Sequence, residues 1–233
     1  PSRRAGVLPA LLLAAGLSAG LASQALAQAE GELIYEHTVR FLAADADHAA
    51  IVPSMGLVEQ MDGIGPMPRA WTTVPEFFHT DEGKEACRVE LAPGTSLYGT
   101  GEVSGPLLRN GRITETWNHD AYGYGDEQGY LYKSFPWVLA VRADGSAFGV
   151  YADTTYRVKI DLTEHIEMTS DGPDFPVIVI EGDSPQDVVM TFADLTGKIE
   201  MPPKWALGYH QCRYSYYPEA RAIEVANGFR ERD

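Results

Sequence analysis

The sequence pattern of residues 33–182 most constrains the fold. Short runs rich in β-branched and aromatic residues alternate there with Gly, Pro, Asn and Asp. Such runs, bounded by turn residues, are typical of β-strands. Asn110-Gly111 predicts a tight turn, and Asp144-Gly145 predicts a hairpin between WVLAVR and AFGVYA. The other runs of this kind are LIYEHTVRF, CRVEL, RITETW, YRVKIDL and VIVIEG. Many short strands at this spacing predict a mainly β protein, a sandwich from Leu33 to about Gly182.

The period of the sequence changes after Gly182. Ser184-Pro185 followed by QDVVMTFADLTGKI predicts a helix with Ser184 as its cap, Pro185 in its first turn and Gly197 at its end. The apolar residues at helical spacing in this segment are Val188, Val189, Phe192 and Leu195. This spacing is typical of an α-helix.

A second domain is predicted to begin after this helix. Met201-Pro202-Pro203 is a stiff connector, and WALGYHQCRY predicts a mostly buried strand in which His210 and Arg213 are hydrogen-bonded. From Pro218 an amphipathic helix is predicted, with Ala222, Val225, Ala226 and Phe229 on one side. A strand followed by a helix is how an α/β barrel begins. The predicted domains are therefore a sandwich over 28–199 and the start of a barrel over 200–233.

The first 27 residues are predicted to be a secretory signal. They have a basic start, an apolar middle and an A-x-A site at Ala25-Leu26-Ala27. The alternative is a membrane anchor, but Gly16, Ser18 and Gly20 interrupt the apolar stretch and no charge cluster follows it. We therefore expect an exported protein, periplasmic or extracellular, without a membrane span in the mature chain. Because the sequence starts at Pro1 and stops within FRERD, we also expect a piece of a longer protein.

The charge of the chain favours a neutral or cationic substrate. With 33 acidic and 18 basic residues the net charge is −15, and loss of the signal removes two further positive charges. Such a field repels phosphate backbones, so nucleic acid is not an expected partner. A disulfide between Cys87 and Cys212 is possible after export, although they fall in different predicted domains. Because C-x-x-C and H-E-x-x-H spacings do not occur, the sequence does not predict a metal site.

Four motifs carry a resemblance to a known family. These are SLYGTGE (96–102), WNHDAYGYG (117–125), AFGVYADTT (147–155) and, most specific, MPPKWALGYHQCRYSY (201–216). In this order they resemble glycoside hydrolase family 31, the α-glucosidase family, from about Leu33 to the last residue. The resemblance implies a galactose-mutarotase-like β-sandwich followed by the first βα unit of a truncated (β/α)8 barrel. It also implies retaining hydrolysis of α-glycosidic bonds without a cofactor.

The resemblance places candidate sugar-binding residues on a loop over residues 114–137, which contains six Trp and Tyr rings and has neither helical nor strand period. By motif position it implies that Asp120 binds sugar hydroxyls and that Tyr122 lines the pocket. Tyr216, outside this loop and just past the predicted barrel strand, would lie at the C-terminal face where such barrels keep their sites, and is a third candidate lining residue. The chemistry agrees, because carboxylates accept hydroxyl hydrogen bonds and rings pack on the C–H faces of a pyranose. Two alternatives remain open. Asp120 could instead cap a turn, and four of the rings could be structural packing: Trp117, Tyr130, Tyr132 and Trp137.

A catalytic pair is not expected within these residues. Retaining glycosidases need two facing carboxylates, and the resemblance implies two aspartates on later barrel strands, beyond Asp233. Glu102 and Asp153 lie in family-like motifs, but we expect both to be structural parts of the sandwich. The sequence thus predicts the front part of a retaining α-glucosidase or α-xylosidase. The alternatives are a non-catalytic carbohydrate-binding sandwich, including a barrel that has lost its aspartates, and an anchored structural module.

Overall fold

The chain divides into two compact units, Pro1–Leu195 and Thr196–Asp233, each of which is described by itself. The structure is a computed structural model that describes residues 29–52 and 62–232. The predicted signal peptide over residues 1–27 therefore lies outside the described residues. Among the residues that are described, no helix has both the length and the apolar character needed to cross a membrane.

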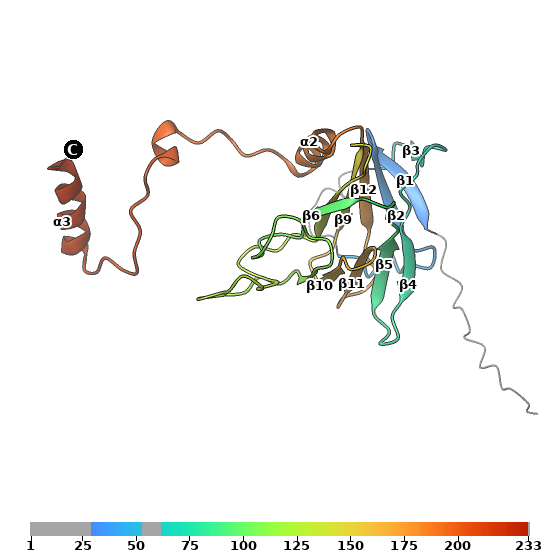
Figure 1. The fold of residues 1–233 in the computed structure, drawn as a ribbon, viewed down its shortest axis with the longest axis horizontal. Coiled ribbons are helices and arrows are strands. Elements are labelled where there is room, and N and C mark those ends of the chain that lie inside the picture. The colour runs from blue at the N-terminus through green and yellow to red at the C-terminus, as the bar shows by residue number, and fades with distance from the viewer. Residues whose placement is uncertain (1–28, 53–61, 233) are drawn as a thin grey trace, which may run out of the picture. The chain divides into compact units, whose positions relative to one another are not determined.

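The first unit consists of two antiparallel sheets, which confirms the predicted β-sandwich (Figure 1). The seven-stranded sheet has the order β3-β1-β2-β12-β9-β8-β6. Its strands are β1 (Glu30–Tyr35), β2 (Thr38–Leu42), β3 (Gly65–Pro66), β6 (Ser96–Gly99), β8 (Trp137–Val141), β9 (Ala147–Ala152) and β12 (Val177–Gly182). The five-stranded sheet has the order β4-β5-β11-β10-β7. Its strands are β4 (Glu76–His79), β5 (Glu85–Val89), β7 (Ile113–Glu115), β10 (Val158–Asp161) and β11 (Ile166–Ser170).

Alternating side chains of β12 explain how the seven-stranded sheet is buried on both faces. Val177 and Val179 belong to the core between the sheets, together with residues of the other sheet such as Met168. Ile178 and Ile180 belong to a second apolar cluster that includes residues of the helix after β12. A strand covered on both faces has an unbroken run of apolar residues rather than an alternating pattern. The VIVI sequence of β12 is such an unbroken run.

The helix α2 (Pro185–Thr196) covers that outer face and begins as predicted. Ser184 Oγ accepts a hydrogen bond from the Asp187 amide (3.3 Å) and donates one to Asp187 Oδ2 (2.7 Å). This reciprocal arrangement satisfies an amide that the first turn leaves free. Three of the four predicted apolar positions face the sheet: Val188 and Leu195 are buried, and Phe192 packs against the same cluster. Val189 is 48% exposed and lies outside the buried face.

The hairpin predicted at Asp144-Gly145 joins β8 to β9, with Val141 opposite Ala147. Gly145 has φ +91°, a conformation that other residues rarely adopt. Asp144 Oδ1 accepts hydrogen bonds from the Ser146 amide (3.0 Å) and hydroxyl (2.7 Å). These hydrogen bonds lower the pKa of Asp144. The turn therefore fixes the register of β8 and β9.

In the second unit the predicted helix is present and the predicted strand is not. The helix α3 (Glu219–Arg230) forms, whereas residues 205–214 contain part of the short 3₁₀ helix η1 (Lys204–Leu207) and irregular chain. His210 and Arg213 are exposed, contrary to the prediction of burial, and His210 Nε2 lies 2.7 Å from the Ala206 carbonyl oxygen. A barrel strand obtains its hydrogen bonds and its cover from neighbouring strands, and the 38 residues of this unit do not supply them.

Candidate functional site

The chain between β6 and β8 carries the predicted sugar-binding residues of the first unit and projects from one end of the sandwich (Figure 1). Beyond the ends of these two strands, residues 100–104 run beside residues 128–137 as an irregular continuation of the β6–β8 ladder. The backbone hydrogen bonds that join them are Thr100 N to Trp137 O (2.8 Å), Glu102 N to Lys133 O (3.0 Å) and Ser104 N to Gln128 O (3.2 Å). The loop is therefore a cross-linked ribbon rather than a single free segment.

A strained bend sets the direction of this ribbon where it leaves β6. Gly99, Thr100 and Gly101 have φ values of +98°, +68° and +84°. A β-branched residue such as Thr100 rarely adopts positive φ, and strain of this kind gathers at binding and catalytic sites. A Cβ added to Gly101 would lie 2.8 Å from the Phe135 amide nitrogen. The close approach of the two sides of the ribbon thus depends on glycine at position 101.

Polar contacts of Ser104 hold the far end of the ribbon. Its Oγ donates to the Gly125 carbonyl (2.7 Å) and accepts from the Gln128 amide (2.8 Å). The buried guanidinium of Arg109 donates in turn to the Ser104 carbonyl (3.2 Å) and the Pro106 carbonyl (3.3 Å). Burial lowers the pKa of Arg109. Hydrogen bonds to carbonyl groups, rather than an apolar core, stabilise this part of the loop.

Asp120 lies between two anchored backbone positions. The amide of His119 donates to the Leu131 carbonyl (2.7 Å), and Ala121 is buried. The carboxylate of Asp120 is exposed, as is Tyr122, whose side chain is 96% exposed. The fold therefore presents the Asp120 carboxylate to solvent between a hydrogen-bonded backbone position, His119, and a buried side chain, Ala121.

Sequence reasoning missed two side chains of this part of the loop, Tyr132, which interacts with Asp120, and Glu102, which interacts with Tyr132. Partial desolvation and the Asp120 carboxylate raise the pKa of Tyr132, and Tyr124 and Glu102 contribute further. Both side chains are exposed. We refer to Glu102, Asp120, Tyr124 and Tyr132 as the acidic–aromatic patch. Glu102 reaches this patch because residues 100–104 pair with residues 128–137. That pairing continues the pairing of SLYG with WVLAV, so predicting SLYG as a strand opposite WVLAV would have indicated that Glu102 lies here.

The other rings of the loop divide between packing and exposure. Trp137 packs as predicted, with its ring centroid 4.1 Å from that of Phe192 in α2. Tyr130 meets the edge of His119 at 5.0 Å. Trp117 is 49% exposed, contrary to the packing prediction. Asp153 is fully buried in the sandwich, in line with a structural role.

A groove of about 460 Å³ lies at the base of the loop. Its walls include the exposed rings of Trp117, Phe135 and Tyr156, with Asn118 among the polar groups. Asp120 and Tyr122 are not among its lining residues. The loop and its base thus carry the acidic–aromatic patch and this aromatic groove.

The third predicted residue, Tyr216, lies in the second unit. Its hydroxyl accepts a hydrogen bond from Gln211 Nε2 (2.6 Å), and the guanidinium carbon of Arg213 lies 5.5 Å from its ring centroid. Within residues 29–52 and 62–232, His, Cys, Asp and Glu side chains do not gather in threes in a way that could hold a metal ion.

Comparison with known proteins identifies the family. The family described as "Glycosyl hydrolase 31 N-terminal galactose mutarotase-like domain" matches residues 24–161, which is more than half of the chain. The chain belongs to glycoside hydrolase family 31. The "Glycosyl hydrolases family 31 TIM-barrel domain" matches residues 199–233 of this family 31 chain. The recognised motifs and the predicted fold class are thereby confirmed.

Relatives of this family 31 chain include enzymes and solved structures. Alpha-glucosidase 2 of Bacillus thermoamyloliquefaciens is 38% identical over 158 residues, which cover 66% of this chain and 20% of that protein. A family 31 α-glucosidase structure from Bacteroides thetaiotaomicron is 47% identical, with a TM-score of 0.57, and the match covers 63% of this chain and 25% of that one. A Flavobacterium johnsoniae dextranase structure with isomaltotriose shares the fold at a TM-score of 0.72 and 24% identity, over 87% of this chain and 29% of the dextranase. The chain spans about a fifth of the length of the curated relatives it matches.

Proposed function

We propose that this chain is the N-terminal part of an exported retaining α-glycosidase that hydrolyses terminal α-glycosidic bonds, and that its loop helps to line the sugar pocket. The observation that carries the proposal is the exposed carboxylate of Asp120 on an anchored backbone, beside Tyr132. Family relatives named α-glucosidase and α-xylosidase support an α-glucoside or α-xyloside as substrate. Export rests on the sequence of residues 1–27.

The residues of this chain suit substrate binding rather than bond cleavage. An ionised carboxylate accepts hydrogen bonds from vicinal hydroxyls, while tyrosine rings cover the C–H face of a sugar. Retaining hydrolysis needs two carboxylates about 5–5.5 Å apart across the scissile bond. In the proposal these come from the part of the enzyme that follows Asp233. The strongly acidic chain is compatible with an uncharged sugar.

Replacing Asp120 in the full-length enzyme tests the proposal. A hydrogen bond to a charged group contributes roughly 1.5–3 kcal/mol, so Asp120→Ala should lower kcat/KM by about one to two decades. The change should leave the free energy of unfolding nearly unaltered, because an exposed carboxylate supports little core. With the deoxy substrate that lacks the contacted hydroxyl, wild type and Asp120→Ala should have the same kcat/KM. A difference that persists for every deoxy analogue would show that Asp120 only shapes the loop.

A second candidate is a non-catalytic carbohydrate-binding sandwich, which the aromatic groove at the base of the loop favours. Exposed rings beside an amide side chain are a common platform for sugars. Binding of isomaltose and xylose oligomers to the 233-residue chain, measured by calorimetry, tests it. Binding that is lost in Tyr156→Ala and kept in Asp120→Ala would support this candidate. Loss in Asp120→Ala alone would support the first.

A further inference from the structure

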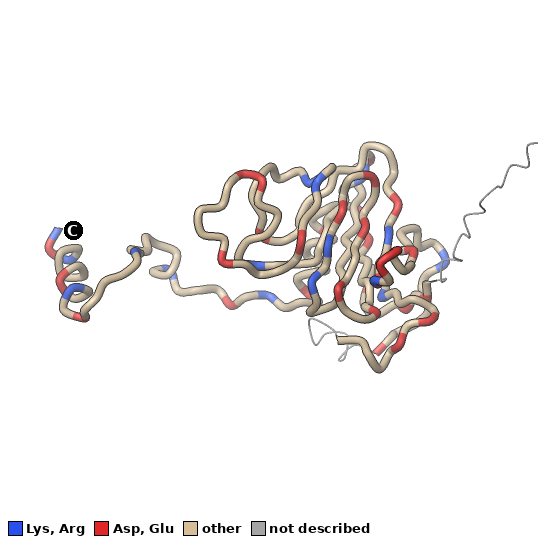
Figure 2. Tube along the Cα trace, turned by 90° about the horizontal axis from the view of Figure 1, so that it is seen from below, with Lys and Arg blue, Asp and Glu red and all other residues tan. Residues whose placement is uncertain are grey.

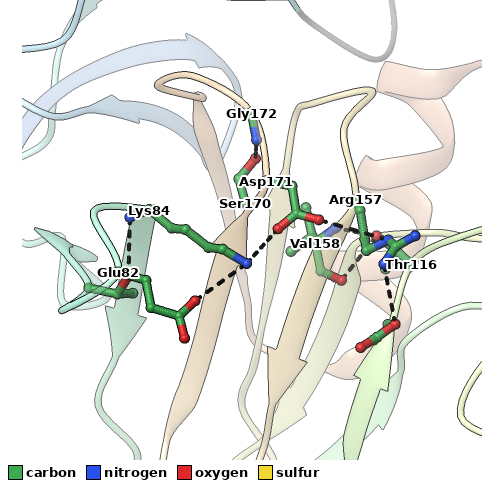
Figure 3. A network of polar contacts seen from close by, with 10 residues as sticks. Glu82, Lys84, Thr116, Arg157, Val158, Ser170, Asp171 and Gly172 are labelled. Atoms are coloured by element: carbon green, nitrogen blue, oxygen red, sulfur yellow. Dashed lines mark hydrogen bonds and ion pairs between the residues drawn. The ribbon is translucent and has the colours of Figure 1, made fainter.

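A row of charged side chains crosses one end of the five-stranded sheet (Figure 3). Asp171, after β11, accepts a hydrogen bond from Lys84 Nζ (2.8 Å) and lies 3.9 Å from Arg157 Nε. Arg157 Nη1 lies 4.0 Å from Glu115 Oε2 at the end of β7, and Lys84 Nζ lies 3.7 Å from Glu82 Oε2. Because β5, β11, β10 and β7 are consecutive in the sheet, the row runs without a gap from the β4–β5 turn to the start of the loop.

Arg157, near one end of this row, also contacts an aromatic ring of the loop. Its guanidinium carbon lies 5.0 Å from the ring centroid of Trp117. A cation at this distance over an indole face is attracted by the ring quadrupole. The carboxylates of Glu115 and Asp171 lie 4.0 Å and 3.9 Å from nitrogens of the same guanidinium and attract it. The position of Trp117 is therefore coupled to a group that the sheet itself holds in place.

The backbone next to Trp117 is attached to the same sheet. Thr116 N donates to the Val158 carbonyl (2.8 Å), and Val158 N donates to Thr116 Oγ1 (3.0 Å). Figure 3 shows these bonds beside Arg157, on adjoining strands of the sheet. Residues 157 and 158 thus contact residues 116 and 117 in two ways, through the Arg157–Trp117 side-chain contact and through the hydrogen bonds between Val158 and Thr116. Asp120 follows three residues later, and its neighbour His119 is tied to Leu131.

We propose that Arg157 is a positioning residue for the sugar-binding loop, in which its guanidinium, held by Glu115 and Asp171, sets the place of Trp117 and through it the place of Asp120. The inference rests on the proposed function, since it assumes that Asp120 meets the sugar. Among the described residues, Trp117 belongs to neither apolar cluster and is half exposed. Its contact with Arg157 therefore affects the position of the loop more than the packing of the sandwich core.

A double-mutant cycle in the full-length enzyme separates positioning from general stability. Arg157→Gln should lower kcat/KM for the α-glucoside by about two- to fivefold, the equivalent of one exposed cation–π contact. In the Asp120→Ala background the same change should have no further effect, because Arg157 acts through Asp120. Asp171→Asn, which weakens the restraint on the guanidinium, should shift kcat/KM in the same direction and provides a second variant should Arg157→Gln fold poorly.

Arg88 supplies a matched control on the same sheet. Its guanidinium lies 3.0 Å from Glu167 and 5.0 Å from the Phe78 ring centroid, so its contacts equal those of Arg157 in kind but do not reach the loop. Arg88→Gln should leave kcat/KM unchanged. Additive effects of Arg157→Gln and Asp120→Ala, or an equal loss in Arg88→Gln, would overturn the inference while leaving the proposed function standing. An Asp120→Ala enzyme with wild-type kcat/KM would reject the proposed function, and the role of Arg157 with it.

Discussion

Cys87 lies in the middle of β5, opposite Phe77 of β4 and Met168 of β11. Burial raises the pKa of its thiol to about 12, and only the thiolate is reactive. We expect the native 233-residue chain to release one equivalent from Ellman's reagent at mildly alkaline pH, through exposed Cys212, and two in denaturant. Cys212→Ser should abolish the native reaction. Two rapid equivalents from the native chain would contradict the burial of Cys87.

The environment of Glu85 in β5 leads us to expect a pH-dependent difference in stability between wild type and Glu85→Gln. Burial raises the pKa of Glu85, the Asp174 carboxylate adds to this, and His79 offsets part of it. Because the folded-state pKa lies above the unfolded one, the charged form destabilises the fold above that pKa. This destabilisation fades as the pH falls through the raised pKa. Glu85→Gln should therefore unfold at higher urea than wild type at neutral pH, and the difference should vanish below the ordinary value of 4.5.

Urea unfolding across a pH series measures this difference. Glu164→Gln, in the exposed turn between β10 and β11, is the matched control and should follow wild type at every pH. A difference between Glu85→Gln and wild type that is constant with pH would mean that the amide gains or loses a contact. In that case the raised pKa would not be its cause.

At the level of elements, the docking of α2 on the seven-stranded sheet depends on a missing side chain. A Cβ added to Gly149 of β9 would lie 1.9 Å from Cη2 of Trp137, the ring that stacks on Phe192. Gly149→Ala should displace the indole and destabilise the fold by about 1–3 kcal/mol. Urea unfolding with near-ultraviolet circular dichroism measures both effects.

Gly65 offers the comparison for this change. It lies in β3 of the same sheet, and a Cβ there would have nothing within 4 Å. Gly65→Ala should therefore change the free energy of unfolding by less than about 0.5 kcal/mol. Equal destabilisation by the two substitutions would show that loss of glycine in the sheet, rather than contact with Trp137, is responsible.

The elements that sequence predicts correctly are those whose signals are local. The Asp144-Gly145 turn and the Ser184 cap depend on neighbouring residues and were predicted, and α3 forms because a helix makes its hydrogen bonds within itself. β4 and β6 were not predicted, because each has four residues and is defined by its partner strand. LIYEHTVRF divides into β1 and β2 because His37 turns the chain at φ +56°.

The predicted sugar-binding residues and the acidic–aromatic patch divide in the same way. Asp120 and Tyr122 follow from the motif WNHDAYGYG, since they are close in sequence. Glu102 and Tyr132 are 30 positions apart, and only the ribbon between β6 and β8 brings them to one environment. The charged row that ends at Arg157 joins segments from 82 to 171 and depends on the strand order of the sheet. Non-local pairing of this kind has no signature in a single sequence.

At the scale of the whole molecule, acidic residues are spread over the sandwich and its loops, and they outnumber basic ones by 33 to 18 (Figure 2). Mutual repulsion of this charge keeps copies of the chain apart in solution. The second unit instead favours association between copies of the chain. Its apolar side chains are exposed, including Met201, Trp205, Leu207, Tyr209 and Phe229. Solution behaviour therefore depends on which of these two properties dominates at a given ionic strength.

We expect the exposed apolar surface to dominate in physiological salt, because screening weakens repulsion beyond about 8 Å while apolar contacts persist. Residues 28–233 should therefore self-associate as concentration rises, whereas residues 28–199, which keep both sheets and α2, should remain monomeric. Light scattering coupled to size-exclusion chromatography, at low and high salt, measures both. Trp205→Ser combined with Tyr209→Ser in the longer chain should reduce association, since these two rings are 80% exposed. A longer chain that stays monomeric at all concentrations would contradict the expectation that the exposed apolar side chains of the second unit cause association.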